Sequence, residues 1–175
     1  MKIHILGIGG TFMAGVAIIA KQLGHTVTGS DKNLYDPMKS VLIKEGIKFT
    51  EGYNSNILKK KIDLVIVGNV MSRGTDIIEK LLEKNINFTS GPQWLHDNVL
   101  KNKNVIAVSG THGKTTTSSL LAWILKYSGF NPSYLIGGLP NNFNSPAKLT
   151  KSKYFVIEAD EYDTAFFDKR SKFIH

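Results

Sequence analysis

The residues with the clearest chemical potential form a glycine-containing turn in the middle of the chain, "SGTHGKTT". Gly110 and Gly113 permit a tight nest of backbone N–H groups around an anion. Lys114 can reach the terminal phosphates of a nucleoside triphosphate, and the Thr115 hydroxyl can ligate Mg²⁺. The Walker pattern G-x-x-x-x-G-K-[ST] would place a glycine where this chain has Val108. An apolar run before the turn and a helical pattern after it still predict the strand–loop–helix arrangement of a phosphate site.

A second glycine-containing turn, "GIGGTFMAG", lies between the first apolar run and the first helical pattern. Gly7 and Gly9 match the first two positions of the dinucleotide pattern G-x-G-x-x-G, but Phe12 occupies the third, which argues against a nicotinamide dinucleotide. Asp31, at the end of the next apolar run, is where a contact with a nucleotide-sugar hydroxyl is expected. We therefore expect a nucleotide or diphosphate site. The alternative is a tight turn that needs glycine for its geometry alone.

A third group of candidates is acidic and follows an apolar run, in the segment "YFVIEADEYD". It contains Glu158, Asp160, Glu161 and Asp163. Since side chains alternate across a strand, Glu158 and Asp160 are expected on the same face. Carboxylate oxygens beside a phosphate loop suit the metal ion that accompanies a nucleoside triphosphate. The alternative is a solvated turn whose acids have no such role.

Alternating strand and helix patterns must position these segments. Short apolar runs that end at glycine or at polar residues predict strands, and helical periodicity closed by glycine predicts helices. Up to residue 100 we expect strands at 2–7, 25–31, 47–52, 63–69 and 86–91, and helices at 11–24, 36–46, 74–85 and 92–100. Such alternation indicates βαβ units and a mainly parallel sheet, so the predicted fold class is α/β.

The pattern starts again after "KNKN", a short polar segment that we interpret as a linker at 101–104. Beyond it the expected strands are 105–109, 133–138 and 153–160, the expected helix is 114–128, and 139–152 is expected to be a loop. The second unit has few strands and stops at "KRSKFIH" without a closing element. It is typical of the opening part of a domain.

The composition restricts the class of protein. Hydrophobic residues make up 42% of the 175 residues, enough for a packed core. The net charge of +8 comes almost entirely from scattered lysines, so we interpret it as solvated surface and expect no nucleic-acid or membrane partner. No apolar run approaches the roughly 18 residues that cross a bilayer. Without cysteine or a signal-peptide pattern, we expect a cytoplasmic protein with no disulfides or thiolate chemistry.

Together, "GTHGKTT", "GIGG" and "EADE" resemble the Mur ligase family, the ATP-dependent amide ligases of peptidoglycan assembly. The resemblance covers the whole chain. It implies a Rossmann-like parallel-sheet domain for the UDP-sugar at 1–100, the linker at 101–104, and an incomplete ATP-binding P-loop domain at 105–175.

Two branches of the family fit the motifs. The segments "GTFMAG", "SGPQWLHD" and "EADEYDTAFFDKRSKF" are similar to the branch that joins the tripeptide L-Ala-γ-D-Glu-meso-diaminopimelate to UDP-N-acetylmuramate in peptidoglycan recycling. The alternative branch joins L-alanine to the same acceptor. That branch more typically has a small residue where Phe12 stands and Ser-Asp instead of Tyr-Asp after "EADE".

The resemblance implies site residues and two cofactors, ATP and Mg²⁺. The UDP-sugar is expected to contact Gly7, Gly9, Gly10, Asp31 and Asn142. The ATP phosphates are expected to contact Gly110, Thr111, His112, Gly113, Lys114, Thr115 and Thr116, with Lys114 as the catalytic cation and with Thr115 and Glu158 as Mg²⁺ ligands. His112 has two open interpretations: a contact with the sugar nucleotide, or support of the turn.

The implied reaction passes through an acyl phosphate, which the amine of the tripeptide then displaces. The resemblance also implies further segments after "KRSKFIH", including an Asn and a His on the next strand and a C-terminal Rossmann-like domain. The chain is then either a piece of a longer ligase or a shortened protein that only binds the UDP-sugar. A Rossmann oxidoreductase is a third hypothesis, which leaves "GTHGKTT" unexplained.

Overall fold

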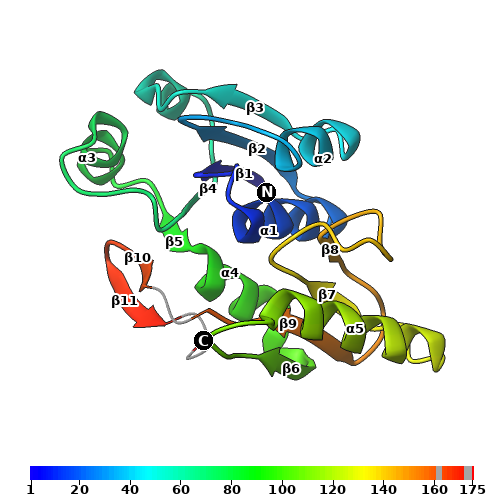
Figure 1. The fold of residues 1–175 in the computed structure, drawn as a ribbon. Helices are drawn as coiled ribbons and strands as arrows, with labels where there is room; N and C mark the ends of the chain where they lie inside the picture. The colour runs from blue at the N-terminus through cyan, green and yellow to red at the C-terminus, as the bar shows by residue number, and fades with distance from the viewer. Residues whose placement is uncertain (161–162, 172–174) are drawn as a thin grey trace.

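The structure is a computed structural model that describes residues 1–160, 163–171 and 175 (Figure 1). Strands and helices alternate along it, so the prediction of an α/β fold is confirmed. We call residues 1–103 the N-terminal unit and residues 104–175 the C-terminal unit. The elements of the N-terminal unit are β1 (Lys2–Leu6), α1 (Thr11–Gln22), β2 (Thr26–Asp31), α2 (Met38–Lys44), β3 (Lys48–Glu51), the 3₁₀ helix η1 (Ser55–Lys59), β4 (Leu64–Val67), α3 (Asp76–Glu83), β5 (Phe88–Ser90), α4 (Gly91–Asn98) and the 3₁₀ helix η2 (Leu100–Asn102). Those of the C-terminal unit are β6 (Asn104–Val108), α5 (Lys114–Tyr127), β7 (Ser133–Leu135), β8 (Ala147–Lys148), β9 (Tyr154–Glu158), β10 (Asp163–Ala165) and β11 (Asp168–Ser171).

The N-terminal unit is built on a five-stranded parallel sheet in the order β3-β2-β1-β4-β5. In this register Ile5 of β1 pairs with Gly29 of β2 on one side and with Ile66 of β4 on the other. The order is that of five of the six strands of a Rossmann sheet, so the expected Rossmann-like parallel sheet is confirmed. The loops after β1, β2 and β4 therefore gather at the carboxyl edge of the sheet, where ligands bind in α/β proteins.

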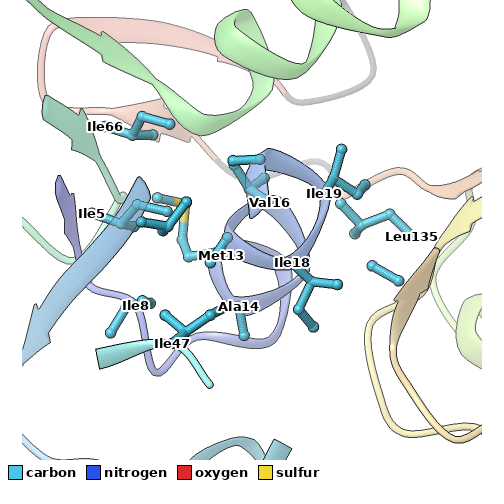
Figure 2. Close-up of a cluster of buried hydrophobic side chains, with 14 of the residues drawn as sticks. Ile5, Ile8, Met13, Ala14, Val16, Ile18, Ile19, Ile47, Ile66 and Leu135 are labelled. Atoms are coloured by element: carbon cyan, nitrogen blue, oxygen red, sulfur yellow. The ribbon is translucent and has the colours of Figure 1, made fainter. Parts of the chain in front are cut away.

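Helix α1 lies between the two units and is buried on all sides. Every residue from Met13 to Ala20 is buried. One side of the helix packs on the five-stranded sheet, and the other packs on β7 and its neighbours through Leu135 (Figure 2). A Cβ at Gly15 would lie 2.9 Å from Leu135 Cγ, so this close approach needs a glycine. A single apolar core therefore runs through both units and fixes the loops at their edges relative to one another.

The opposite face of the five-stranded sheet is covered by α3 and η1. Their apolar side chains form a second core cluster with β4, which includes Leu58, Val65 and Ile78. No helix within the described residues is long and apolar enough to cross a bilayer.

The C-terminal unit has a four-stranded sheet in the order β6-β9-β7-β8, parallel except for the β7–β8 pair. Helix α5 packs on it through Ala122 and an aromatic group that includes Tyr134 and Phe143. The prediction of a continuous loop at 139–152 was wrong at β8, which is too short for any periodicity to reveal. The antiparallel hairpin β10–β11 was also not predicted, because its charged residues break the apolar pattern.

Candidate functional site

The loop between β6 and α5 has the backbone geometry of an anion nest. Gly110 lies at φ 145° and Gly113, the N-cap of α5, at φ 77°, both in the region that favours glycine. Helix α5 begins at Lys114, so its positive end is directed at the loop. Lys114 Nζ donates to the Gly110 carbonyl oxygen at 2.7 Å and lies 3.9 Å from Asp160 Oδ1. The lysine thus folds over the loop, where a phosphate oxygen can replace the carbonyl as acceptor.

Thr115 and Glu158 form a polar pair beside this loop. Thr115 Oγ1 donates to Glu158 Oε1 at 3.0 Å, and the N–H of Gly137 donates to Glu158 Oε2 at 2.8 Å. Glu158 is only 8% exposed, so these two bonds hold a carboxylate that water hardly reaches. A Cβ at Gly137 would lie 2.7 Å from Glu158 Oε2, so the glycine makes room for the carboxylate.

The same pair of oxygens is suited to a hard divalent cation. A hydroxyl and a carboxylate oxygen 3.0 Å apart can share one Mg²⁺, which commonly takes its other ligands from phosphates and water. Among the residues that the structure describes, no group of three or more His, Cys, Asp or Glu side chains is arranged to hold a metal.

The loop between β1 and α1 is held in shape from within. Gly7, at φ 81°, donates its N–H to the Ser30 carbonyl at 2.9 Å, and Gly10 donates to the Gly7 carbonyl at 3.3 Å. Asp31 Oδ2 accepts the N–H of Gly9 at 2.8 Å. The Asp31 carboxylate thus ties the loop to β2, a role that we did not predict, and its contact with a nucleotide hydroxyl stays a prediction. The positive end of α1 follows the loop and favours an anion there.

The first glycine loop and the end of β9 border a cleft of about 320 Å³ between the two units. The residues that matter to its chemistry are Gly7, Gly10 and Phe12 on one side and Gly137, Glu158 and Asp160 on the other. The first glycine loop therefore faces Glu158, whose carboxylate accepts the Thr115 hydroxyl at the start of α5, across this cleft. A ligand whose phosphates bind at α1 can extend toward a second phosphate group at α5.

Other predicted site residues lie elsewhere. Asn142 is exposed and lines a separate hollow of about 290 Å³, away from the cleft. Thr111, His112 and Thr116 are exposed on the phosphate loop and the first turn of α5. Glu161 lies outside the described residues. The ligand contacts predicted for these positions stay predictions.

Sequence reasoning missed one residue of the site and one contact of another. Gly137 donates its N–H to Glu158, and its only signal in the sequence is the Gly-Gly pair that ends the strand expected at 133–138. Asp160 was expected on one face with Glu158, but its ion pair with Lys114 joins segments that are far apart in the sequence. Only the pairing of β6 with β9 brings those segments together.

The chain matches two parts of one protein family. Residues 2–103 match "Mur ligase family, catalytic domain", and residues 108–173 match "Mur ligase middle domain".

Individual relatives agree with this match. The chain is 59% identical over all of its 175 residues to the UDP-N-acetylmuramate–L-alanyl-γ-D-glutamyl-meso-2,6-diaminoheptandioate ligase of Escherichia coli (strain K12), and it spans 38% of that protein. It is 38% identical over 170 residues to the UDP-N-acetylmuramate–L-alanine ligase of Buchnera aphidicola subsp. Acyrthosiphon pisum (strain APS), which is 94% of this chain and 34% of that protein.

The fold agrees as well. The crystal structure of UDP-N-acetylmuramate:L-alanyl-γ-D-glutamyl-meso-diaminopimelate ligase from Neisseria meningitides superimposes with a TM-score of 0.95 at 52% identity, covering 99% of this chain and 57% of that one. With its sheet order, its two glycine loops and matches over both units, this chain belongs to the Mur ligase family.

Proposed function

We propose that this chain supplies the sugar-nucleotide site and the phosphate site of an ATP-dependent ligase. The reaction joins the tripeptide L-Ala-γ-D-Glu-meso-diaminopimelate to UDP-N-acetylmuramate, in the cytoplasm where ATP is available. The observation that carries the proposal is the single cleft bordered by Gly10 on one side and Glu158 on the other. The tripeptide is favoured over L-alanine because identity is 59% to the relative named for the tripeptide and 38% to one named for L-alanine.

The residues divide into two groups with different ligands. The loop of Gly7, Gly9 and Gly10, shaped by Asp31, binds the diphosphate of the sugar nucleotide at the positive end of α1. The loop from Gly110 to Thr116 binds the phosphates of ATP. Residues 1–100 and 105–175 are the corresponding domains, with 101–104 as their linker.

Lys114 is the catalytic cation of this proposal. A carboxylate is a poor electrophile, so the lactoyl carboxylate of the muramate first attacks the γ-phosphorus of ATP, forming an acyl phosphate and releasing ADP. The tripeptide amine then attacks the acyl carbon, loses its proton and displaces phosphate, which leaves the amide. Phosphoryl transfer depends on positioning and charge neutralisation. Lys114, 2.7 Å from the Gly110 carbonyl, is placed to neutralise the transferred phosphoryl group.

Thr115 and Glu158 fit the role of Mg²⁺ ligands. Their oxygens lie 3.0 Å apart, and the Glu158 carboxylate is already oriented by the N–H of Gly137. Mg²⁺ at this place would neutralise charge on the β- and γ-phosphates. The buried Glu158 carboxylate is deprived of most of its water, so a cation is a favourable replacement for the hydrogen bond that it now accepts from the Thr115 hydroxyl.

Equilibrium binding tests the two sites separately. The 175-residue chain is titrated by calorimetry with UDP-N-acetylmuramate and with ATP plus Mg²⁺. Lys114→Ala removes a charge-assisted contact, so it should weaken ATP binding by about tenfold or more and leave the sugar nucleotide unaffected. Lys151→Ala, an exposed lysine between β8 and β9, is the matched control and should change neither affinity. Failure to bind UDP-N-acetylmuramate, or binding of a nicotinamide dinucleotide in its place, would contradict the proposal.

A chimera tests the reaction itself. The chain replaces the matched 38% of the Escherichia coli relative, and ligation is measured with the tripeptide and with L-alanine as the amine. We expect ATP-dependent ligation of the tripeptide, abolished by Lys114→Ala. Preference for L-alanine would move the chain to the other branch. Binding of both nucleotides without ligation of either amine would support a non-catalytic, UDP-sugar-binding role.

A further inference from the structure

The hairpin β10–β11 belongs to the C-terminal unit but lies against the N-terminal unit, beside β5 and α4 (Figure 1). The Phe167 ring meets the ring of Phe88 of β5 edge to face, with centroids 5.0 Å apart. Phe166 packs against the apolar cluster of β4 and α3. Arg170 donates to Gln93 Oε1 of α4 at 3.0 Å. The segment "FFDKR" thus makes apolar and polar contacts with the other unit.

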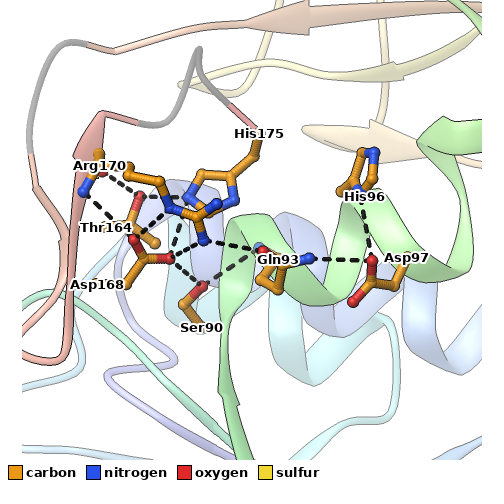
Figure 3. A network of polar contacts seen from close by, with 8 residues as sticks. All are labelled: Ser90, Gln93, His96, Asp97, Thr164, Asp168, Arg170 and His175. Carbon is orange, nitrogen blue, oxygen red and sulfur yellow. Dashed lines mark hydrogen bonds and ion pairs between the residues drawn. The ribbon is translucent and has the colours of Figure 1, made fainter.

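Asp168 is the centre of the polar part of this contact (Figure 3). It is only 8% exposed. Arg170 binds it in bidentate fashion, with both N–O distances at 2.9 Å. His175 Nε2 lies 3.1 Å from its Oδ2, and the Ser90 hydroxyl donates to the same oxygen at 3.5 Å.

The side of the N-terminal unit that receives Asp168 is the start of α4. Ser90 caps this helix by accepting the N–H of Gln93 at 3.3 Å, and it faces Asp168 as well. The positive end of α4 stabilises a carboxylate at this place. The Arg170 hydrogen bonds, the largest influence, hold the pKa of Asp168 below its usual value, so it is ionised at neutral pH.

We propose that the β10–β11 hairpin is a clasp that holds the two units at a fixed angle, with Asp168 and Arg170 as its positioning residues. The units already meet along α1 and β7, where Gly15 lies against Leu135. This contact is part of the apolar core that the two units share, which already limits their relative motion. The clasp adds a second contact at the other end of the cleft, which therefore keeps its width.

The position of the cleft supports this role. Its wall runs from Leu135, at the contact of α1 with β7, to Thr164 of the hairpin. Glu158 and Asp160 lie on the chain directly before the hairpin, so an anchor at Asp168 also fixes these acids relative to the first glycine loop. Asp168 and Arg170 do not line the cleft, so they act through the geometry of other residues.

The consequence for ligands rests on the proposed function. UDP-N-acetylmuramate reaches across both units, whereas the phosphates of ATP bind within the C-terminal unit. Loss of the clasp should therefore weaken binding of the sugar nucleotide by about tenfold, a typical coupling between sites, and leave ATP binding unchanged. A general loss of structure would weaken both.

The relative position of the two units can be measured without any ligand. The chain contains no cysteine, so Tyr35→Cys and Tyr127→Cys place two spin labels on exposed sites, one in each unit. Double electron–electron resonance then reports the distance between the units. We expect a narrow distance distribution in the otherwise unchanged chain and a broad one after Asp168→Ala or Gln93→Ala.

A matched control lies on the same hairpin. Lys169→Ala breaks only the ion pair with Asp163 within the hairpin, at 3.0 Å, and should leave the distribution narrow. If Asp168→Ala does not fold, the distance distribution of Gln93→Ala decides the test, because the Gln93 side chain lies on the surface of α4. A distribution that stays narrow in a folded Asp168→Ala or Gln93→Ala variant overturns the clasp. Absence of sugar-nucleotide binding in the parent chain overturns the proposed function instead, and the distance measurement still decides on the clasp.

Discussion

Gly137→Ala should displace the carboxylate on which the proposed metal site depends. The new methyl carbon would lie 2.7 to 2.8 Å from three atoms of the Glu158 carboxylate, closer than van der Waals contact allows. Glu158 must then move away from both the Gly137 N–H and the Thr115 hydroxyl. A hydrogen bond to a charged group contributes about 1.5–3 kcal/mol, and overpacking costs about 1–3 kcal/mol. Movement of Glu158 relieves the overpacking but gives up hydrogen bonds to the charged carboxylate. We therefore expect the free energy of unfolding to fall by about 3 kcal/mol.

The neighbouring glycine provides the control. A Cβ at Gly138 would lie 3.4 Å from Thr115 Cγ2, which is close to ordinary contact, so Gly138→Ala should change the unfolding free energy by less than about 1 kcal/mol. Urea unfolding measures stability, and electron paramagnetic resonance of Mn²⁺ with ATP measures metal affinity. Gly137→Ala should weaken Mn²⁺ binding by about tenfold, and Glu158→Asp in the same chain, with its shorter side chain, should restore part of the stability. Stability and Mn²⁺ affinity equal to those of Gly138→Ala would refute the reasoning.

Three further predictions concern the fold and the loops. Burial lowers the pKa of His4 from 6.5 to about 4, so its contribution to stability is constant above pH 6.5, and about 3 kcal/mol is lost as the pH falls toward 4. His4→Gln should therefore make the free energy of unfolding in urea less dependent on pH between 6.5 and 4. An unchanged pH dependence would contradict this. Gly15→Val should force α1 away from Leu135, lowering the melting temperature and broadening the distribution of distances between the units, unlike Gly138→Ala, whose new carbon would meet only Thr115 Cγ2 at 3.4 Å. Gly113→Val should weaken ATP binding measured by calorimetry, because the residue lies at φ 77°, and unchanged affinity would contradict the nest.

Local patterns in the sequence predicted the elements and the two glycine loops. The loop around Lys114 was recognisable without the glycine that the Walker pattern requires, because a strand and a helix flank it. Helix α1 was also predictable from its periodicity, although a helix so apolar on every side gives no sign of which neighbours cover it. Its second neighbour, β7, begins more than a hundred residues later in the chain, at Ser133. The burial of α1 between two sheets was therefore outside the reach of sequence patterns.

The contacts that shape the cleft share this non-local character. The Asp31 carboxylate accepts the N–H of Gly9, and the Glu158 carboxylate accepts the N–H of Gly137. The Ser90 hydroxyl donates to Asp168. In each case the two partners lie on different elements, and a glycine N–H or a helix cap supplies the polar group. A glycine pattern indicates that a backbone approaches something closely, but it does not say whether the partner is a ligand or another part of the protein. Gly9 shows why this matters: it was expected to contact the sugar nucleotide, and it donates its N–H to the Asp31 carboxylate of the chain itself. The proposed phosphate sites therefore depend on the N-terminal ends of α1 and α5, and the carboxylates of Asp31 and Glu158 hold the loop before α1 and the first turn of α5 in place.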